Sequence, residues 1–224
     1  MAKQIQLKDT DLEDLEDVLQ VAAASFNIQF AENELRHIET FGQFCDYFTS
    51  KLKRTHCDDC TTQQAFYKFR NALAMVTVTD AKVIRPDSPI SSLLPSLNRR
   101  SRVAKLNEAL GLELNLLRPP HWITTALLLT LLGSIGLLFI DWRLGLSGIG
   151  LAVLGFQIAD RFGNELNEAT VGVVVRNMAT YRYAQSRRDP QTFNKVEVET
   201  VLGTLLSKHL GLDGLGRNAR FLER

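Results

Sequence analysis

The strongest constraint on the fold is an uncharged, apolar stretch, WITTALLLTLLGSIGLLFI, at residues 122–140. A helix needs ~20 apolar residues to cross the hydrocarbon core of a bilayer, and this stretch is close to that length. A second uncharged stretch, LGLSGIGLAVLGFQIA at residues 144–159, is shorter and needs flanking residues to span the bilayer. Unpaired peptide groups are costly in lipid, so the two stretches predict a transmembrane helical hairpin over residues 119–160. The alternative is a long buried hairpin in a soluble protein.

Small residues predict how the two hairpin helices pack. In the second stretch they recur at helical spacing on one face: Gly148, Ala152, Gly155 and Ala159. In the first stretch a matching series is Ala126, Thr130 and Gly133. Small faces let two helices approach closely in lipid, so we expect the two series to face each other.

Basic residues predict the orientation of the hairpin. Those that precede it are Arg99, Arg100, Arg102, Lys105 and Arg118. Those that follow it are Arg161, Arg176, Arg182, Arg187 and Arg188. The turn offers only Arg143, close to Asp141. Because basic flanks stay in the cytoplasm, we predict a multi-pass protein of the cell (inner) membrane with both termini cytoplasmic.

Composition narrows the classes of partner and compartment. The formal net charge is +1, which gives no electrostatic footprint for nucleic acid. The three cysteines, Cys45, Cys57 and Cys60, are an odd number at irregular spacing. This pattern favours a reducing compartment over a disulfide framework. Residues 1–20 are polar and contain no signal-peptide core, so insertion is expected to start from the internal hairpin.

Outside the hairpin, apolar periodicity predicts an all-α protein. An N-terminal helix is expected where apolar residues recur on one face: Leu12, Leu15, Leu19, Ala22 and Phe26. Thr40 is placed to cap a second helix, whose apolar face includes Cys45 and Phe48. Cys45 is therefore expected in a core and not in a reactive pocket.

The chain also contains a loose internal repeat. The sequence Glu39-Thr40-Phe41-Gly42 opens one predicted helix, and Ala169-Thr170-Val171-Gly172 opens another. Each helix is followed by a polar connector, at residues 55–64 and 184–195, that leads into a further helix. Repetition of this kind predicts two copies of one supersecondary unit.

Three motifs in the middle of the chain occur in an order that a known family uses. A helix at about residues 63–77 leads to Pro86-Asp87-Ser88, a second helix ends at Leu110-Gly111-Leu112, and Thr170-Val171-Gly172 starts a last helix. This pattern resembles the acyl carrier proteins, small four-helix bundles that bear a phosphopantetheine arm. The resemblance implies that the hairpin is inserted between the second and last helices of one such bundle.

The two ends of the chain resemble the halves of a second bundle. Residues 196–224 resemble a first helix with part of the long loop. Residues 9–52 resemble the remaining helices, with Phe26-Asn27-Ile28 at the turn and Thr40-Phe41-Gly42 at the last helix. Short amphipathic helices cannot cover their own apolar faces, so we expect the ends to pair as a circularly permuted bundle. The pairing can occur within one chain or between the chains of a homo-oligomer.

These expectations divide the chain into five segments. Residues 1–54 and 191–224 are expected to form the permuted bundle. Residues 55–118 and 161–190 are expected to form the second bundle, and residues 119–160 the hairpin. The predicted fold is therefore all-α, with two small acyl-carrier-like helical bundles and a two-helix transmembrane hairpin.

The resemblance also implies where a phosphopantetheine arm would be attached. Counting back from Leu110-Gly111-Leu112 gives Ser96, which is followed by Leu97 as in the family but preceded by Pro95 in place of aspartate. The same count in the N-terminal segment gives Leu12, which has no hydroxyl. We interpret Ser96 as a helix cap and keep it as a weak candidate for phosphopantetheine. No other cofactor is expected.

The helix after Ser96 begins with a basic run at residues 98–102. Acyl carrier proteins present an acidic helix to their partner enzymes, whereas the matching helix here is basic. The resemblance therefore implies that a partner of this chain would carry the opposite charge to a partner of that family. The simplest interpretation of the run is a solvated helix face. The run is close to the hairpin, which also suggests contact with anionic lipid headgroups. Each basic residue near such a surface contributes ~1 kcal/mol to the free energy of membrane binding.

Catalytic and metal chemistry find little support in the sequence. Cys57 and Cys60 form one CxxC pair, whereas a structural zinc site needs four ligands. The chain contains no phosphate-binding glycine loop, no nucleophile elbow and no HExxH motif. We therefore predict no catalytic residues and no metal ligands.

Three functions are compatible with these sequence features. The leading hypothesis is a non-enzymatic, membrane-anchored, acyl-carrier-like interaction module that binds an unidentified protein partner at the cytoplasmic face. Its other partner is the lipid bilayer, and no nucleic acid is expected. The second hypothesis is a true membrane-tethered acyl carrier modified on Ser96. The third is a subunit of a membrane enzyme or transporter complex.

Overall fold

The computed structural model describes residues 12–31, 34, 38–212 and 214–220. In these residues the chain forms ten α-helices, a short 3-10 helix and four strands of two residues each. The prediction of a mostly helical, all-α protein is therefore confirmed. Parts of the expected segments 1–54 and 191–224 lie outside the described residues.

The chain divides into two compact units. Unit 1 comprises residues 1–71 and 174–224, and unit 2 comprises residues 72–173. The expected segment boundaries at residues 54, 118, 160 and 190 stay predictions.

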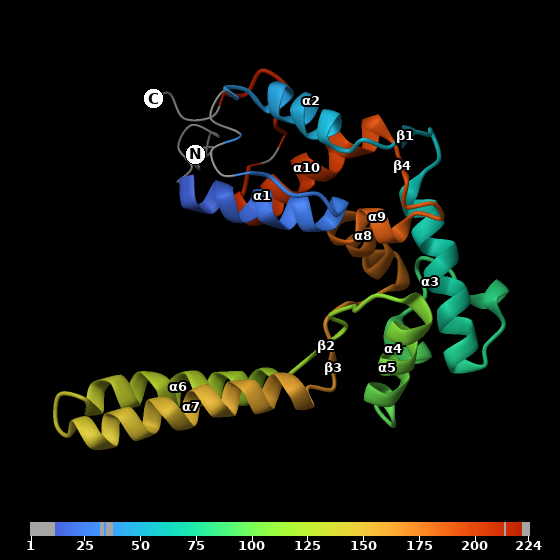
Figure 1. Cartoon of the computed structure of the whole chain (residues 1–224). Coiled ribbons are helices and arrows are strands. Elements are labelled where there is room, and N and C mark those ends of the chain that lie inside the picture. The colour runs from blue at the N-terminus through green and yellow to red at the C-terminus, as the bar shows by residue number, and fades with distance from the viewer. Residues whose placement is uncertain (1–11, 32–33, 35–37, 213, 221–224) are drawn as a thin grey trace. The chain divides into compact units, whose positions relative to one another are not determined.

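Unit 1 brings together helices from both ends of the chain (Figure 1). Its elements are α1 (Leu12–Phe26), α2 (Phe41–Lys51), β1 (Thr55–His56), most of α3 (Thr61–Thr77), most of α8 (Val171–Tyr181), α9 (Tyr183–Ser186), β4 (Thr192–Phe193) and α10 (Lys195–Leu210). Strands β1 and β4 pair in parallel, with Thr55 opposite Thr192. This pairing brings the two polar connectors into contact.

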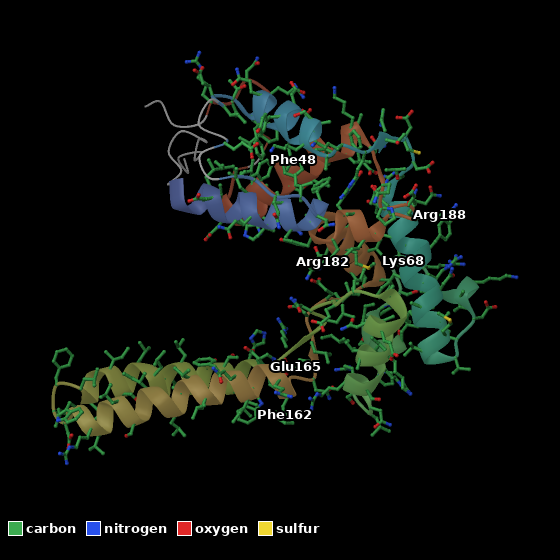
Figure 2. The ribbon with its side chains drawn as sticks, in the orientation of Figure 1. Phe48, Lys68, Phe162, Glu165, Arg182 and Arg188 are labelled. Atoms are coloured by element: carbon green, nitrogen blue, oxygen red, sulfur yellow. The ribbon has the colours of Figure 1, made fainter. Side chains whose placement is uncertain are left out.

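One apolar core joins α1, α2 and α10. Phe26 at the end of α1 stacks on Tyr183, with ring centroids 4.3 Å apart. Phe26 also makes an edge contact with Phe48, which is labelled in Figure 2, with ring centroids 5.0 Å apart. From α10, Leu202 and Leu205 are buried in the same core. Each helix presents only one apolar face, so the N-terminal and C-terminal helices of a single chain cover one another.

Unit 2 contains the hairpin and the helices that flank it. Its elements are the end of α3, η2 (Ala81–Val83), α4 (Ile90–Leu93), α5 (Arg99–Leu110), β2 (Leu117–Arg118), α6 (His121–Leu137), α7 (Trp142–Phe162), β3 (Glu165–Leu166) and the start of α8. Helices α6 and α7 lie antiparallel, side by side (Figure 1). Strands β2 and β3 pair antiparallel at their base, with Leu117 opposite Leu166.

The hairpin packs through the small residues of α7, as the sequence predicts for that helix. A Cβ atom added to Gly148 would overlap Ser134 Oγ, and one added to Gly155 would lie 2.5 Å from a Leu127 methyl carbon. Ala152, between them, is fully buried. Only residues without a larger side chain allow this approach.

The matching series predicted on α6 is wrong. Ala126, Thr130 and Gly133 are exposed, whereas Ser134 is buried against α7. The small residues of α7 instead receive larger side chains, such as Leu127 of α6 and Leu138 of the turn. The small residues of α7 form a groove, and larger side chains from the other helix fill it as a ridge. Close packing therefore does not require small residues on both helices.

The lengths of the two hairpin helices differ from the sequence prediction. Helix α6 has 17 residues and ends at Leu137, so the last three residues of the first apolar stretch form the turn. Helix α7 has 21 residues because Asp141 caps its start and it continues through Asp160 and Arg161. By length and composition α7 is able to cross a membrane, whereas α6 is a shorter apolar helix. That both helices span a membrane stays a prediction.

The two helix starts of the internal repeat make the same backbone contacts. In unit 1, Phe41 N donates to Ala219 O at 2.8 Å and Gly42 N donates to Arg217 O at 2.8 Å. In unit 2, Val171 N donates to Ser88 O at 3.0 Å and Gly172 N donates to Pro86 O at 2.7 Å. Each start is thus paired with a loop that lies far away in sequence.

Two helix ends are also alike. Asn27, the residue after α1, has φ 53°, and Gly111, the residue after α5, has φ 66°. The next amide bonds back five residues in both places, from Ile28 N to Ala23 O at 2.9 Å and from Leu112 N to Asn107 O at 3.2 Å. This left-handed turn with a long return bond is a frequent way to end a helix.

Alanine at the repeated glycines is expected to destabilise the protein. A Cβ at Gly42 or Gly172 would lie 2.9 Å from a backbone oxygen, of Arg217 or Pro86 respectively. Relieving such an overlap costs about 1–3 kcal/mol. We expect each variant to show a loss of this size in thermal unfolding followed by circular dichroism in detergent.

Gly203→Ala is the matched control for these substitutions. A Cβ at this position of α10 would meet only the Phe41 ring, at 3.8 Å. Because alanine is favoured over glycine inside a helix, we expect no loss and a gain of up to about 1 kcal/mol. If Gly172→Ala were as stable as this control, the close contact with Pro86 would not form.

Candidate functional site

Ser96 lies in an exposed bend before α5, and the prediction that it caps this helix is wrong. The cap residue is Asn98, in the left-handed region with φ 59°, and the helix begins at Arg99. The backbone carbonyl of Ser96 accepts a hydrogen bond from Asn164 Nδ2 at 3.2 Å. The side chain is exposed, as is that of Leu97. The side chain of Ser96 is therefore accessible from solvent.

Arg99 fixes this bend to the end of α7 within unit 2. Its Nε donates to Leu94 O at 2.7 Å and its Nη1 donates to Asn164 O at 2.5 Å. Together with the Asn164 contact to Ser96, these bonds tie the loop before α5 to the residues that follow the hairpin. Arg99 is part-buried, so its guanidinium has a bracing role.

Arg100 makes a second contact with the base of the hairpin. Its Nη2 donates to Arg161 O at 2.7 Å, and its guanidinium carbon lies 4.8 Å from the centroid of the Phe162 ring. Phe162 is the last residue of α7 and is exposed (Figure 2). The carbonyls of a last helical turn carry partial negative charge, so a cation is favoured there.

The outward faces of the hairpin carry large apolar side chains that no residue covers within the described part of the chain (Figure 2). On α6 the exposed ones include Leu128, Leu129, Leu132, Ile135 and Leu137. On α7 they include Leu144, Leu146, Leu151, Leu154 and Ile158. A continuous apolar surface of this kind is typical of a contact with lipid or with another protein.

A buried polar network in unit 1 joins the two connectors. Glu197, near the start of α10, accepts hydrogen bonds from Thr61 N at 2.8 Å, Thr61 Oγ1 at 2.5 Å and Tyr183 OH at 3.1 Å. Arg187 has no exposed side-chain surface, and its Nη1 lies 3.7 Å from Glu197 Oε2. The same nitrogen donates to Thr61 Oγ1 at 2.6 Å. The network links the start of α3 to the start of α10.

The network is structural in character and was not predicted. Burial raises the pKa of Tyr183 above its ordinary value, and its hydroxyl also accepts a hydrogen bond from Asn194 N at 2.9 Å. In the sequence, Arg187 is predicted only as part of the basic flank of the hairpin, and Glu197 falls in residues 196–224, which are predicted only to form a helix with part of a loop. Neither residue has a neighbour in sequence that signals burial, so the contact is visible only in three dimensions.

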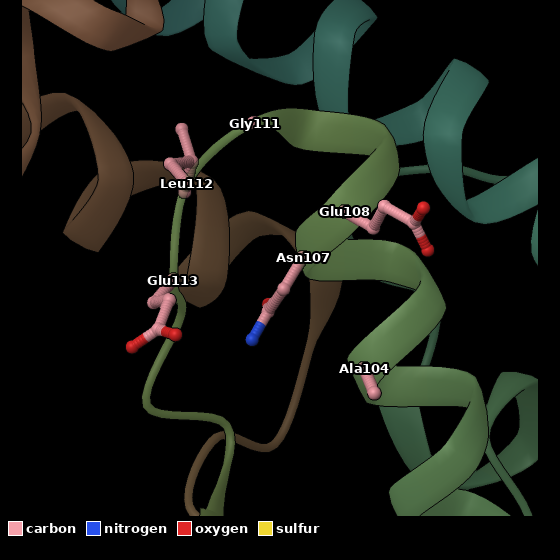
Figure 3. Close-up of a pocket in the computed structure, with 6 residues that line it drawn as sticks. All are labelled: Ala104, Asn107, Glu108, Gly111, Leu112 and Glu113. Atoms are coloured by element: carbon pink, nitrogen blue, oxygen red, sulfur yellow. The ribbon is translucent and has the colours of Figure 1, made fainter.

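The helix end at Gly111 borders a solvent-open hollow of about 510 Å³ (Figure 3). Its lining comes from α5 and the turn after it: Ala104, Asn107, Glu108, Gly111, Leu112 and Glu113. The side-chain oxygen of Asn107 already has a hydrogen-bond partner, because Oδ1 accepts a hydrogen bond from Leu114 N at 3.2 Å. The hollow brings together no nucleophile with a base, and we assign it no chemistry.

The CxxC pair and the histidines do not gather in the described residues. Cys57 is half-buried and Cys60 is exposed, and both are free thiols. His56 lies 3.3 Å from Asp58, through Nε2 and Oδ1. Within the described ranges, no group of three or more His, Cys, Asp or Glu side chains is placed to hold a metal ion.

The three cysteines are expected to differ in reactivity. Burial raises the pKa of Cys45 to about 12, so this thiol is not ionised near neutral pH. Since the thiolate is the reactive form, we expect iodoacetamide to modify Cys57 and Cys60 in the folded protein, and Cys45 only after denaturation. Peptide mass spectrometry gives the site of each adduct. Equal labelling of Cys45 under native conditions would contradict its place in the core.

Comparisons with protein-family models, with curated proteins and with solved structures found no match. Ser96, the hairpin surface and the hairpin base are therefore the features from which a function can be inferred.

Proposed function

We propose that the protein is a membrane-anchored helical interaction module, in which the α6–α7 hairpin crosses the bilayer and the other helices face the cytoplasm. The observation that carries this proposal is the apolar outer surface of the hairpin. Residues such as Leu129 and Leu151 are 64% and 67% exposed, while the small residues of α7 are turned inward. In water such a surface is unfavourable, whereas lipid covers it without cost.

The charge distribution supports the orientation. The base of the hairpin carries Arg100, Arg118 and Arg161, while its turn carries Arg143 and Asp141. The base therefore stays in the cytoplasm, and the turn is translocated. Trp122 and Trp142 are exposed near opposite ends of the hairpin, as residues at the two membrane interfaces are.

The interaction role is supported by apolar side chains that are exposed outside the hairpin. They include Met75, Val83, Leu97 and Val196. The repeated contacts of Gly42 and Gly172 support two carrier-like bundles, whose helical surfaces are used in that family to contact partner proteins. The proposal gives the chain no catalytic step, and turnover by the purified protein would contradict it.

Membrane insertion and orientation can be tested on the full-length protein. After alkaline carbonate washing we expect it to stay in the membrane pellet. In spheroplasts, a membrane-impermeant maleimide should label Phe139→Cys in the turn, because Phe139 is 90% exposed. The native Cys57 and Cys60 should react only after the membrane is opened. Labelling of Cys57 and Cys60 in intact spheroplasts would show the opposite orientation. Release of the protein by carbonate would show that the hairpin does not anchor it in the membrane.

A second function, that of a membrane-tethered acyl carrier, is favoured by the exposure of Ser96 and Leu97. A modifying enzyme needs an accessible serine hydroxyl next to a helix start. Intact mass spectrometry of the protein, co-expressed with a phosphopantetheinyl transferase, tests this function. One phosphopantetheine adduct that is lost in Ser96→Ala would establish it, and an unmodified wild type would exclude it for that enzyme.

A further inference from the structure

We propose that the base of the hairpin binds anionic phospholipid headgroups through Arg100 and Arg161, with Phe162 at the level of the headgroups. This inference rests on the proposed membrane anchor and adds a lipid class to it. The three residues are defined here as the lipid collar.

The position of the collar follows from the end of the apolar surface. Ile158 is the last large apolar residue of α7 before Asp160, the first charged residue after the hairpin core. Arg161 comes next, and its carbonyl holds the guanidinium of Arg100 at 2.7 Å. Both guanidinium groups therefore belong to the level at which α7 leaves the hydrocarbon, where lipid phosphates lie.

The chemistry of the collar fits a phosphate ester. A guanidinium is planar, remains charged, and presents several N–H donors that match phosphate oxygens. Arg100 and Arg161 are both exposed, so their other donors are accessible from the membrane side. Arg100 also stacks on Phe162, an arrangement that suits the membrane interface, where aromatic side chains are enriched.

Acidic residues near the collar do not cancel it. Glu165 faces Arg118 across the β2–β3 pair, with Nε and Oε2 4.0 Å apart. Asp160 is exposed and adds one negative charge next to Arg161. Further along α5, Lys105 is exposed and Arg102 is half-buried, which leaves the base of the hairpin with an excess of positive charge.

Native mass spectrometry of the full-length protein in detergent measures this selectivity. The probes are short-chain phosphatidylglycerol, which is anionic, and short-chain phosphatidylcholine, which is zwitterionic. We expect the wild type to bind phosphatidylglycerol more tightly. At ~1 kcal/mol for each basic residue at an anionic surface, Arg100→Gln/Arg161→Gln should lose about 30-fold of that affinity and keep its weaker affinity for phosphatidylcholine.

Two further variants control for folding and for total charge. Arg161→Gln alone leaves the backbone contact with Arg100 in place, and it should lose about 5-fold in affinity. Arg85→Gln removes an exposed arginine of the same unit that lies outside the collar, and it should match the wild type. An affinity of the double variant within about 3-fold of wild type, or an equal loss in Arg85→Gln, overturns the collar.

The lipid site and the anchor fail in different ways. If carbonate releases the wild type, the anchor is wrong and the collar, which depends on it, is wrong too. If the wild type stays in the membrane while the double variant keeps its phosphatidylglycerol affinity, only the collar is wrong. Displacement of phosphatidylglycerol by an equal concentration of inorganic phosphate would also overturn it, because the site would then bind a free anion.

Discussion

Leu129→Arg/Leu151→Arg is expected to prevent the full-length protein from staying in the membrane after carbonate washing. The two side chains lie near the middle of α6 and α7 and are 64% and 67% exposed. An arginine at the centre of a spanning helix costs about 3 kcal/mol, so the pair costs about 6 kcal/mol. The equilibrium constant for insertion should therefore fall by about four powers of ten.

The matched control is Met75→Arg/Val83→Arg. These side chains lie outside the hairpin and are 68% and 65% exposed, close to the values for the leucines. In water, a surface substitution of this kind changes stability by less than about 0.5 kcal/mol. We expect this variant to stay in the membrane pellet. If both double variants behaved alike, the outer face of the hairpin would be in contact with water or protein, and the anchor would be wrong.

Glu197→Gln is expected to lower the free energy of unfolding of unit 1 by about 3–5 kcal/mol. The substitution keeps the size of the side chain but leaves the guanidinium of Arg187, which has no exposed surface, without its nearest carboxylate. A buried charge that loses its partner keeps the cost of desolvation and loses the compensating attraction. Chemical unfolding followed by the near-ultraviolet circular dichroism of the tyrosines, all four of which belong to unit 1, reports this loss.

Glu199→Gln provides the comparison on the same helix. Glu199 pairs with Arg217 at 2.5 Å, but both side chains are well exposed, at 38% and 46%. A solvated ion pair contributes less than about 1 kcal/mol, so this loss should be small. Arg187→Met/Glu197→Gln should recover part of the stability, because the uncompensated charge is then gone. Equal losses in Glu197→Gln and Glu199→Gln would mean that water reaches Arg187.

The position of the hairpin could be predicted because it depends on composition over a long window. The limits of its helices could not, because a charged residue does not end a helix. Asp141 accepts a hydrogen bond from Arg143 N at 2.9 Å and so starts α7. Asp160 and Arg161 then continue the helix to Phe162. The first uncharged stretch is the longer one in the sequence, but the second stretch forms the longer helix, α7.

The candidate residue Ser96 shows a similar limit. The count from the turn at Gly111 located a serine before a helix, but the left-handed Asn98 sets the helix start. Which residue caps a helix depends on backbone angles that are fixed by contacts further away, here those of Arg99 with Leu94 and Asn164. No pattern in the sequence reports those contacts.

The amino-acid sequence by itself determined the helical class, the place of the apolar hairpin and the small-residue face of α7. These properties follow from periodicity and composition, which act over neighbouring residues. The sequence predicts that the two ends of the chain pair, but only the tertiary structure decided that α1, α2 and α10 share a core within one chain. Only the structure decided that Arg187 is buried beside Glu197. It also decided that Arg100 reaches the end of α7. The core and the Arg100 contact join residues far apart in the chain, whereas Arg187 and Glu197 are only ten residues apart but lie on different elements. Each of these contacts forms only when folding brings the side chains together, so local sequence patterns do not report it.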